Sequence, residues 1–397
     1  MTQLYSDWSN VLIYVAMAVY ALALIGFAMD LANRSAARGR QSASAAGATK
    51  RAGMAVASDG VARSGSVEGV QRAAASGSLD AATDQAASTG TLLLERRGAA
   101  GDAVIETTAD GQTLVDTDLP GGELAADQSI TQIRARDADG WRDGRATASL
   151  QIAMTLTVVA FLAHLAATVL RGLAADRVPW SNMYEFTMTS TLLVVLVFLV
   201  AQLWNDIRFL GTFISGFVTL SLGIAAVGFY VPVAPLQPAL QSYWLVIHVF
   251  VASLATGCLA LGCGLSIMQL LQHRRTAAMR SGRRSRLGFL AALPGEERLE
   301  DLSYRINVVG FILWTFTLVA GAIWAERAWG RYWGWDTKEV WTFIIWVVYA
   351  GYIHARATKG WRGSPSAWLS IVGFATVLFN FGVVNIFFKG LHTYSGL

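Results

Sequence analysis

The stretch from Trp324 to Trp346 reads WAERAWGRYWGWDTKEVWTFIIW, and the interpretation of the whole chain starts from it. It contains six of the fourteen tryptophans in the protein. At its centre, Trp329 to Asp336, glycines and charged residues interrupt two apolar runs, so we expect a short loop or partial helix at a membrane surface. Flat aromatic surface is therefore concentrated in this loop.

Two interpretations of these tryptophans are open from the residues alone. Tryptophan has a large apolar face and one N–H donor, which suits a planar ligand with an apolar body and polar edges. Haem is such a ligand. Tryptophan also collects at membrane surfaces without any ligand, as an aromatic belt. The loop by itself favours the two about equally.

Composition indicates the class of protein independently of the loop. The chain is 54% hydrophobic and only 15% charged, and its apolar residues are gathered into long runs. This pattern predicts an all-α polytopic membrane protein. Eight runs are long enough to cross a bilayer: 10–30, 150–171, 184–204, 210–231, 243–271, 305–325, 339–357 and 366–388.

The distribution of basic residues predicts the orientation of these spans. No Lys or Arg precedes the first run, whereas Arg34, Arg38, Arg40 and Lys50 follow it. This excludes an ordinary secretory signal and favours an uncleaved helix whose N-terminus lies outside. With eight spans, both termini and the tryptophan-rich loop then lie outside. The net charge of +4 follows from this topology and does not indicate nucleic-acid binding.

The chain divides into three predicted parts: an N-terminal transmembrane helix (1–31), a cytoplasmic insertion (32–148) and a seven-helix membrane domain (149–397). The insertion is rich in Ala, Ser, Gly and Thr and has no sustained apolar period, so we expect it to be mostly disordered. Within it, 91–94 and 103–115 are candidates for short strands or a hairpin.

The two cysteines, Cys258 and Cys263, fall in the fifth predicted span. Five residues place them about 140° apart around a helix, so we expect no disulfide between them. The chain has no CxxC pair, which argues against a thiol-redox enzyme. Both cysteines are therefore interpreted as small buried side chains.

Four of the five histidines lie in or next to predicted spans. His248 lies roughly 8 Å below the outer surface, and His392 follows the last span, so both are near the depth of the loop. A membrane histidine is costly without a partner. The pair either ligates one haem iron or hydrogen-bonds neighbouring helices. His354 lies near the inner end of the seventh span, over 10 Å in depth from His164, so these two are poor candidates for one site. His164 is interpreted as a packed polar residue.

The segment WGRYWGWDTKEVW resembles the tryptophan-rich WWD signature of haem-handling membrane proteins, and most of all the CcsA (ResC, CcsB) family of cytochrome c biogenesis. Further segments resemble landmarks of that family in the same order: 182–185 (NMYE), 240–248 (LQSYWLVIH), 352–356 (YIHAR) and 390–394 (GLHTY). The resemblance covers roughly residues 150–397.

This resemblance implies a haem site. Members of the family hold haem between the WWD loop, here 324–341, and two flanking histidines, which correspond to His248 and His392 as iron ligands. Tryptophans of the loop and its aspartate would hold the haem plane. These residues are Trp329, Trp333, Trp335 and Asp336. His354 matches an intramembrane histidine thought to receive haem from the cytoplasmic side, a second haem site whose other ligand a partner would supply.

Function and partners follow from the same resemblance. The protein would present haem b at the outer face of the plasma membrane for covalent attachment to the CxxCH thiols of apocytochrome c. It would be a subunit of a holocytochrome c synthetase, and its own side chains need supply no nucleophile. A ResB-like (Ccs1-type) membrane partner is implied. The alternatives are a haem transporter without a ligase role and a respiratory cytochrome subunit.

Charged residues of the loop leave two pairings open. The three bases Arg327, Arg331 and Lys338 are candidates to pair with haem propionates. They are equally candidates to pair with the acidic residues Glu326, Asp336 and Glu339. We interpret Asp336 as a residue that fixes the loop through its backbone or a neighbouring tryptophan N–H.

Overall fold

The computed structural model describes residues 1–64, 104–107, 113–116, 147–234, 241–281, 288–358 and 360–392. Residues 1–39 and 137–397 belong to one compact unit and residues 40–136 to a second. In the second unit, β1 (Val104–Thr107) and β2 (Thr113–Asp116) form an antiparallel hairpin within the range that the sequence predicts for one. The other candidate, 91–94, lies outside the described residues.

The described part of the first unit is a helical bundle, as predicted, and every predicted span has a helix at its position. The helices are α1 (Thr2–Ser64), α3 (Ala148–Ala175), α4 (Met183–Ala201), α5 (Gly211–Gly228), α6 (Tyr243–Arg280), α7 (Glu296–Trp329), α8 (Thr337–Ala357) and α9 (Ser364–Phe379), which continues through a π-helical segment (Asn380–Val384) into α10 (Asn385–Phe387). Among described residues, seven helices are long and apolar enough to cross a membrane. The eighth, α8, has charged residues near both ends, which lowers its mean hydropathy.

The first helix is longer than predicted. The sequence predicts its end at residue 31 and a disordered segment from residue 32, whereas α1 continues to Ser64. Residues 32–64 are rich in alanine and contain no proline, so their intrinsic helix propensity sustains the helix beyond the apolar run. The predicted disorder of 65–103, 108–112 and 117–146 lies outside the described residues.

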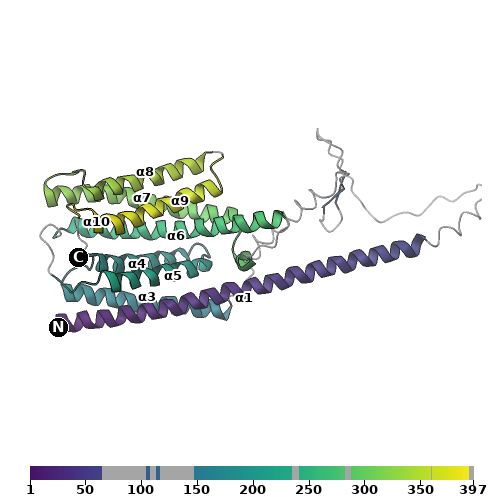
Figure 1. Cartoon of the computed structure of the whole chain (residues 1–397), viewed down its shortest axis with the longest axis horizontal. Coiled ribbons are helices and arrows are strands. Elements are labelled where there is room, and N and C mark those ends of the chain that lie inside the picture. The colour runs from purple at the N-terminus through teal and green to yellow at the C-terminus, as the bar shows by residue number, and fades with distance from the viewer. Residues whose placement is uncertain are drawn as a thin grey trace, which may run out of the picture. The chain divides into compact units, whose positions relative to one another are not determined.

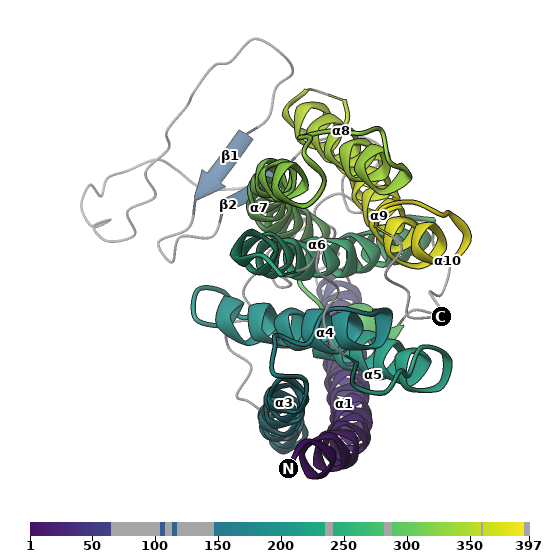
Figure 2. The same ribbon diagram turned by 90° about the vertical axis from the view of Figure 1, so that its left-hand side faces the viewer.

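Short connections make successive helices from α3 to α5 and from α7 to α9 antiparallel. The N-terminus of α1 and α10 therefore lie at the same end of the bundle (Figure 1), together with residues 330–336 between α7 and α8. We call this end the loop end. Figure 2 looks along the bundle from this side and shows α6 between α4 on one side and α7 and α9 on the other.

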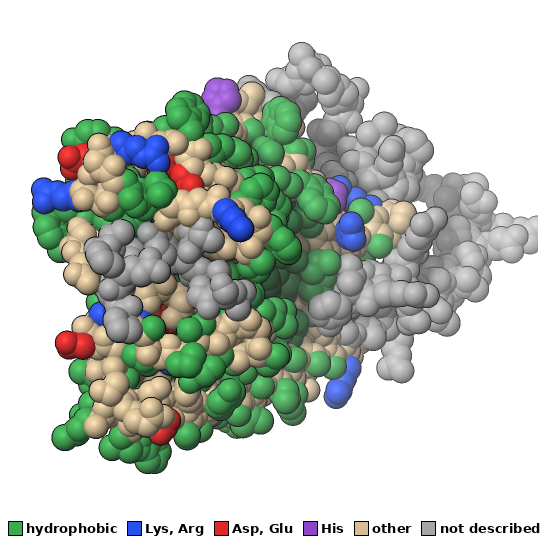
Figure 3. Space-filling model, turned by 60° about the vertical axis from the view of Figure 1, so that its left-hand side comes forward, with side chains coloured by type: hydrophobic (Ala, Val, Ile, Leu, Met, Phe, Trp, Pro, Cys, Tyr) green, Lys and Arg blue, Asp and Glu red, His purple; other side chains and the backbone are tan. Residues whose placement is uncertain are grey.

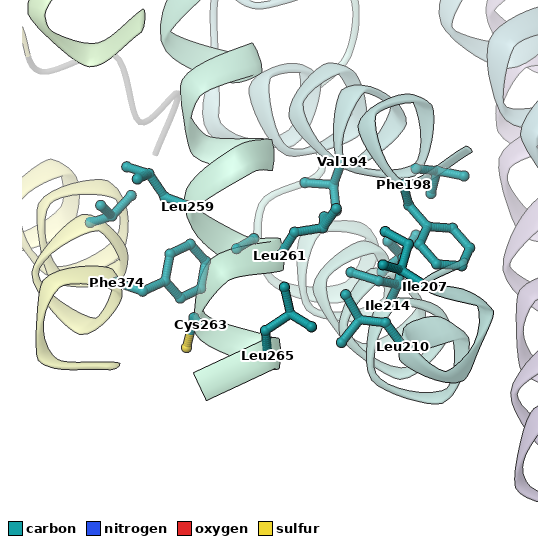
Figure 4. Packing of buried hydrophobic residues seen from close by; sticks show 14 of the residues in the cluster. Val194, Phe198, Ile207, Leu210, Ile214, Leu259, Leu261, Cys263, Leu265 and Phe374 are labelled. Atoms are coloured by element: carbon teal, nitrogen blue, oxygen red, sulfur yellow. The ribbon is translucent and has the colours of Figure 1, made fainter. Parts of the chain in front are cut away.

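The core of the bundle forms around α4 and α6. Side chains of α4, α5, α6 and α9 interdigitate there, including Val194, Ile214, Leu261 and Phe374 (Figure 4). Cys263 points into the same cluster, and both cysteines are buried and free, as predicted. The surface of the bundle seen in Figure 3 is largely hydrophobic, and its charged side chains gather mainly toward the ends, as expected of a surface that meets lipid.

Three buried charges join α3 to α4 at the loop end. Arg171 Nε lies 3.1 Å from Glu185 Oε1, and an Nη atom of Arg177 lies 2.7 Å from Glu185 Oε2. Arg171 also donates to the carbonyl of Val231 at 2.5 Å. A carboxylate that accepts from two guanidinium groups is stabilised despite burial. This ion-pair cluster fixes the wall of the cavity described next.

Candidate functional site

A cavity of about 470 Å³ opens within the bundle at the loop end. Its volume falls in the range of roughly 300–1,000 Å³ that is typical of small-molecule sites. Its wall is mainly apolar and includes residues of α4, α5, α6, α7, α8 and α9. Of the residues that the sequence singles out for ligand binding, His248, His392, Trp333 and Lys338 line it.

His248 is held on the cavity wall by α7. Its Nδ1 lies 3.0 Å from the carbonyl oxygen of Thr317, which only accepts, so Nδ1 carries the proton. The ring stacks on Trp324 with centroids 6.0 Å apart. Gly321 makes room for the ring, because a Cβ at this position would lie 2.8 Å from His248 Cε1. These contacts leave Nε2 as the lone-pair nitrogen.

His392 is held by the loop itself. Its Nδ1 donates to Oδ2 of Asp336 at 2.8 Å, and this hydrogen bond holds the pKa of the Asp336 carboxyl below its usual value. The ring packs edge-on against Trp324 and Trp329, with centroids 5.6 and 4.8 Å away. Among the described residues, none hydrogen-bonds Nε2 of either His248 or His392. With Nδ1 donating in each ring, the neutral form of either imidazole would ligate a metal through Nε2.

Asp336 and Glu339 build the loop between α7 and α8 through a capping box. Asp336 caps α8 by accepting from the amide of Lys338, and Glu339 Oε2 accepts from the amides of Gly334 and Asp336 at 2.7 and 3.1 Å. Gly330 ends α7 in the left-handed conformation, with φ of 71°. Asp336 thus fixes the loop through backbone groups, and its further partner is His392.

The tryptophans fall into different environments. Trp324 is 1% exposed and touches both histidines, a central position that the sequence does not predict. Trp333 lines the cavity and is 36% exposed. Trp335 is 78% exposed and has a φ of 58°, in the left-handed region. Trp324 and Trp333 therefore form part of the cavity wall, Trp329 packs behind it against Trp324 and His392, and Trp335 is mostly exposed.

The remaining histidines lie apart from the cavity. His354 is exposed near the opposite end of α8, and among described residues its imidazole has no hydrogen-bond partner. His164 is buried and its Nε2 donates to the carbonyl of Met188 at 2.9 Å, as expected of a packed polar residue. His273 contacts Glu296 at the surface.

The charged residues divide in a way that the sequence does not predict. Arg327 and Arg331 are exposed and do not line the cavity, whereas Lys338 does. The sequence indicates no role for Glu185, which pairs with two arginines of the ion-pair cluster. One feature of the sequence does point to Glu185. An ionisable residue in or beside an apolar span needs a charged or polar partner.

The chain is similar to known proteins of one family. The profile of the cytochrome C assembly protein family matches residues 180–392. A cytochrome c biogenesis protein CcsA from Synechococcus sp. (strain CC9605) is 35% identical over 262 residues, which cover 60% of this chain and 85% of that relative. CcsA from Parasynechococcus marenigrum (strain WH8102) is 36% identical over 266 residues, covering 61% and 86%.

Solved structures are also similar to this chain. The cytochrome c heme lyase CcmF superimposes with a TM-score of 0.44 at 20% identity, covering 72% of this chain and 52% of that one. The family profile spans more than half of the chain, and the CcsA relatives are matched over most of their own length. The chain therefore belongs to the cytochrome c assembly protein family, as a multi-pass membrane protein with a role in cytochrome c maturation.

Proposed function

We propose that this protein binds haem b in the cavity at the loop end and presents it for attachment to apocytochrome c. The observation that carries the proposal is the pair of imidazoles, His248 and His392, which line one cavity with Nδ1 engaged by an acceptor and Nε2 left open. Two neutral imidazoles are an ordinary axial ligand set for haem iron.

The surroundings of the pair fit the same ligand. Trp324 and Trp333 offer apolar ring faces to a planar macrocycle. Asp336 and the Thr317 carbonyl orient the two imidazoles from behind, as outer partners of metal-bound histidines commonly do. Trp329 supports His392 from the side, and the exposed Trp335 would lie where the cavity meets a partner.

The reaction that the bound haem supports needs little from the chain. Haem supplies the vinyl groups to which the CxxCH thiols of the cytochrome add. The protein holds the iron through His248 and His392, orients the macrocycle and limits access of water, so its contribution is positioning. None of its side chains acts as a nucleophile.

Orientation and partners complete the proposal. The basic residues after the first apolar run and between α6 and α7 support an orientation in the plasma membrane with those segments inside and the loop end outside. A ResB-like partner would complete a holocytochrome c synthetase. His354, exposed on α8, would contribute to a second haem site with a ligand from that partner.

An absorption spectrum of the purified complex tests the binding, and an attachment assay with co-expressed apocytochrome c tests the ligase role. We expect a bis-histidine haem spectrum and loss of holocytochrome c when the gene is deleted. Haem binding with normal attachment in the deletion strain would indicate a transporter or a respiratory cytochrome subunit instead. A purified complex with no Soret absorbance after haem is supplied would overturn the proposal.

A further inference from the structure

The cavity carries one cationic side chain. Among the described residues that line it, Lys338 is the only Lys or Arg, and Glu339 is the only Asp or Glu. Lys338 lies in the first turn of α8, between Asp336 and Glu339, which fix the loop. Its ammonium group therefore shares the space that His248 and His392 face.

The partners of this ammonium are all neutral. Its Nζ donates to the carbonyl oxygen of Asn380 at 3.0 Å and to Oδ1 of Asn385 at 2.7 Å. An ammonium has three donors, so one remains beyond these two bonds. No carboxylate in the described part of the chain forms an ion pair with it. Of the nearby acids, Asp336 binds His392 and the Leu391 amide, and Glu339 accepts from loop amides through Oε2, while its Oε1 is buried with no hydrogen-bond partner among the described residues.

The two acceptors hold the ammonium in a defined place. Asn380 begins the π-helical segment, and π-helical turns often occur at functional positions. Asn385 is anchored in turn, because its amide donates to the Phe381 carbonyl at 2.8 Å. Lys338 is thus positioned by neutral groups on the next span, which fix its direction without neutralising its charge.

Burial among neutral groups disfavours the charged form of Lys338, and a bound anion would stabilise that form. We propose that Lys338 binds a propionate carboxylate of haem and so sets which edge of the macrocycle enters beside α8. This inference rests on the proposed function. Of the three basic residues that the sequence offers for pairing with propionates, only Lys338 lines the cavity. Arg327 and Arg331 are exposed and lie off it.

The test compares haem with haem dimethyl ester, in which both carboxylates are masked and iron ligation is unchanged. The purified complex is titrated as wild type, Lys338→Met, Lys338→Arg and Lys389→Met, the last removing an exposed cation at the same end. We expect wild type to prefer the diacid, and Lys338→Met to weaken diacid binding by at least about tenfold with little change for the ester. Lys338→Arg should keep part of the preference and Lys389→Met all of it.

Each other outcome is distinguishable. If Lys338→Met is monodisperse, keeps the bis-histidine spectrum and discriminates between diacid and ester as wild type does, the inference is wrong and the proposed function stands. If wild type binds neither haem nor its ester, the proposed function itself fails. Displacement of haem by equimolar oleate in wild type but not in Lys338→Met would assign the carboxylate to a lipid and overturn the haem contact.

Discussion

His392 Nδ1 lies 2.8 Å from Asp336 Oδ2, and this contact joins the last described residue of the chain to the N-cap residue of α8. The other oxygen of Asp336 accepts from the Leu391 amide at 3.1 Å. One carboxylate therefore caps a helix, fixes the backbone after α10 and orients an imidazole. Gly390 allows this approach, because a Cβ there would collide with Asp336 Oδ1.

Two substitutions of Asp336 distinguish its role as a helix cap from its role in orienting His392. Asn keeps an N-cap oxygen but loses the charge that orients His392. We expect Asp336→Asn to weaken haem binding by about 10–100-fold with little loss of stability. Asp336→Ala should also remove the cap and lower the free energy of unfolding by about 1 kcal/mol. Haem titration and thermal denaturation of both variants measure the difference, and equal haem affinity in Asp336→Asn and wild type would contradict the assignment.

Removal of either proposed ligand should leave a space that free imidazole can fill. We expect His248→Gly and His392→Gly each to abolish cytochrome c maturation, with partial recovery when imidazole is added to the growth medium. A histidine that only packs leaves no open iron position for imidazole to occupy. Holocytochrome c is measured by haem staining, with His273→Gly as the surface control. Failure of rescue in both variants, with an unchanged haem spectrum, would remove the pair as ligands.

The contact between Gly321 and His248 predicts an indirect effect. A methyl group at position 321 would lie 2.8 Å from His248 Cε1 and displace the ring. We expect Gly321→Ala to reduce haem occupancy by about tenfold or more, as for other groups that orient a metal ligand. Gly351→Ala is the matched control, because a Cβ there has nothing within 4 Å. Equal occupancy in the two variants would show that the ring is not confined there.

Trp333 and Trp335 should differ although they are two residues apart. Trp333 lines the cavity, whereas Trp335 is mostly exposed. We expect Trp333→Ala to lower haem occupancy and Trp335→Ala to leave it near the wild-type value, with the spectrum of the remaining haem unchanged in both. The double variant should resemble Trp333→Ala. Normal occupancy in the double variant would favour the aromatic belt.

The second unit, residues 40–136, is expected to be dispensable. It is a compact unit of its own, and nothing in its sequence resembles a family landmark. We expect deletion of residues 45–140 to leave maturation largely intact, since a segment without core-forming composition tolerates change. The assay is holocytochrome c yield, with membrane abundance of the protein followed by immunoblot. Loss of yield at normal abundance would assign the segment a function.

The sequence predicted the placement of the histidines better than their contacts. Alternation of eight spans puts positions 248 and 392 at one end of the bundle, and both residues do line one cavity there. The partners, Thr317 and Asp336, lie 69 and 56 residues away in the chain. Such contacts depend on how each helix is rotated about its own axis. A span that is apolar on all faces has no amphipathic pattern from which that rotation could be predicted.

For the same reason, the sequence did not predict that Trp324 contacts both histidines. Nor did it predict that Lys338 lines the cavity while Arg327 and Arg331 do not. Trp324 and Lys338 lie in a stretch where tryptophans and charges are dense, so composition cannot tell which of them faces inward. The length of α1 was underestimated for a different reason. Hydropathy marks where a helix leaves the apolar layer, whereas the helix itself continues as far as its propensity allows.

The ion-pair cluster of Arg171, Arg177 and Glu185 has a consequence for biosynthesis. A lone Arg or carboxylate within a nascent span opposes its release into lipid by roughly 2.5–3.5 kcal/mol at the centre of the bilayer. Arg171 ends one apolar run and Glu185 begins the next, and only a short turn separates them. Pairing with Glu185 leaves the cluster with a net charge of +1 in place of three separate charges, so α3 and α4 should leave the translocation machinery together as a hairpin.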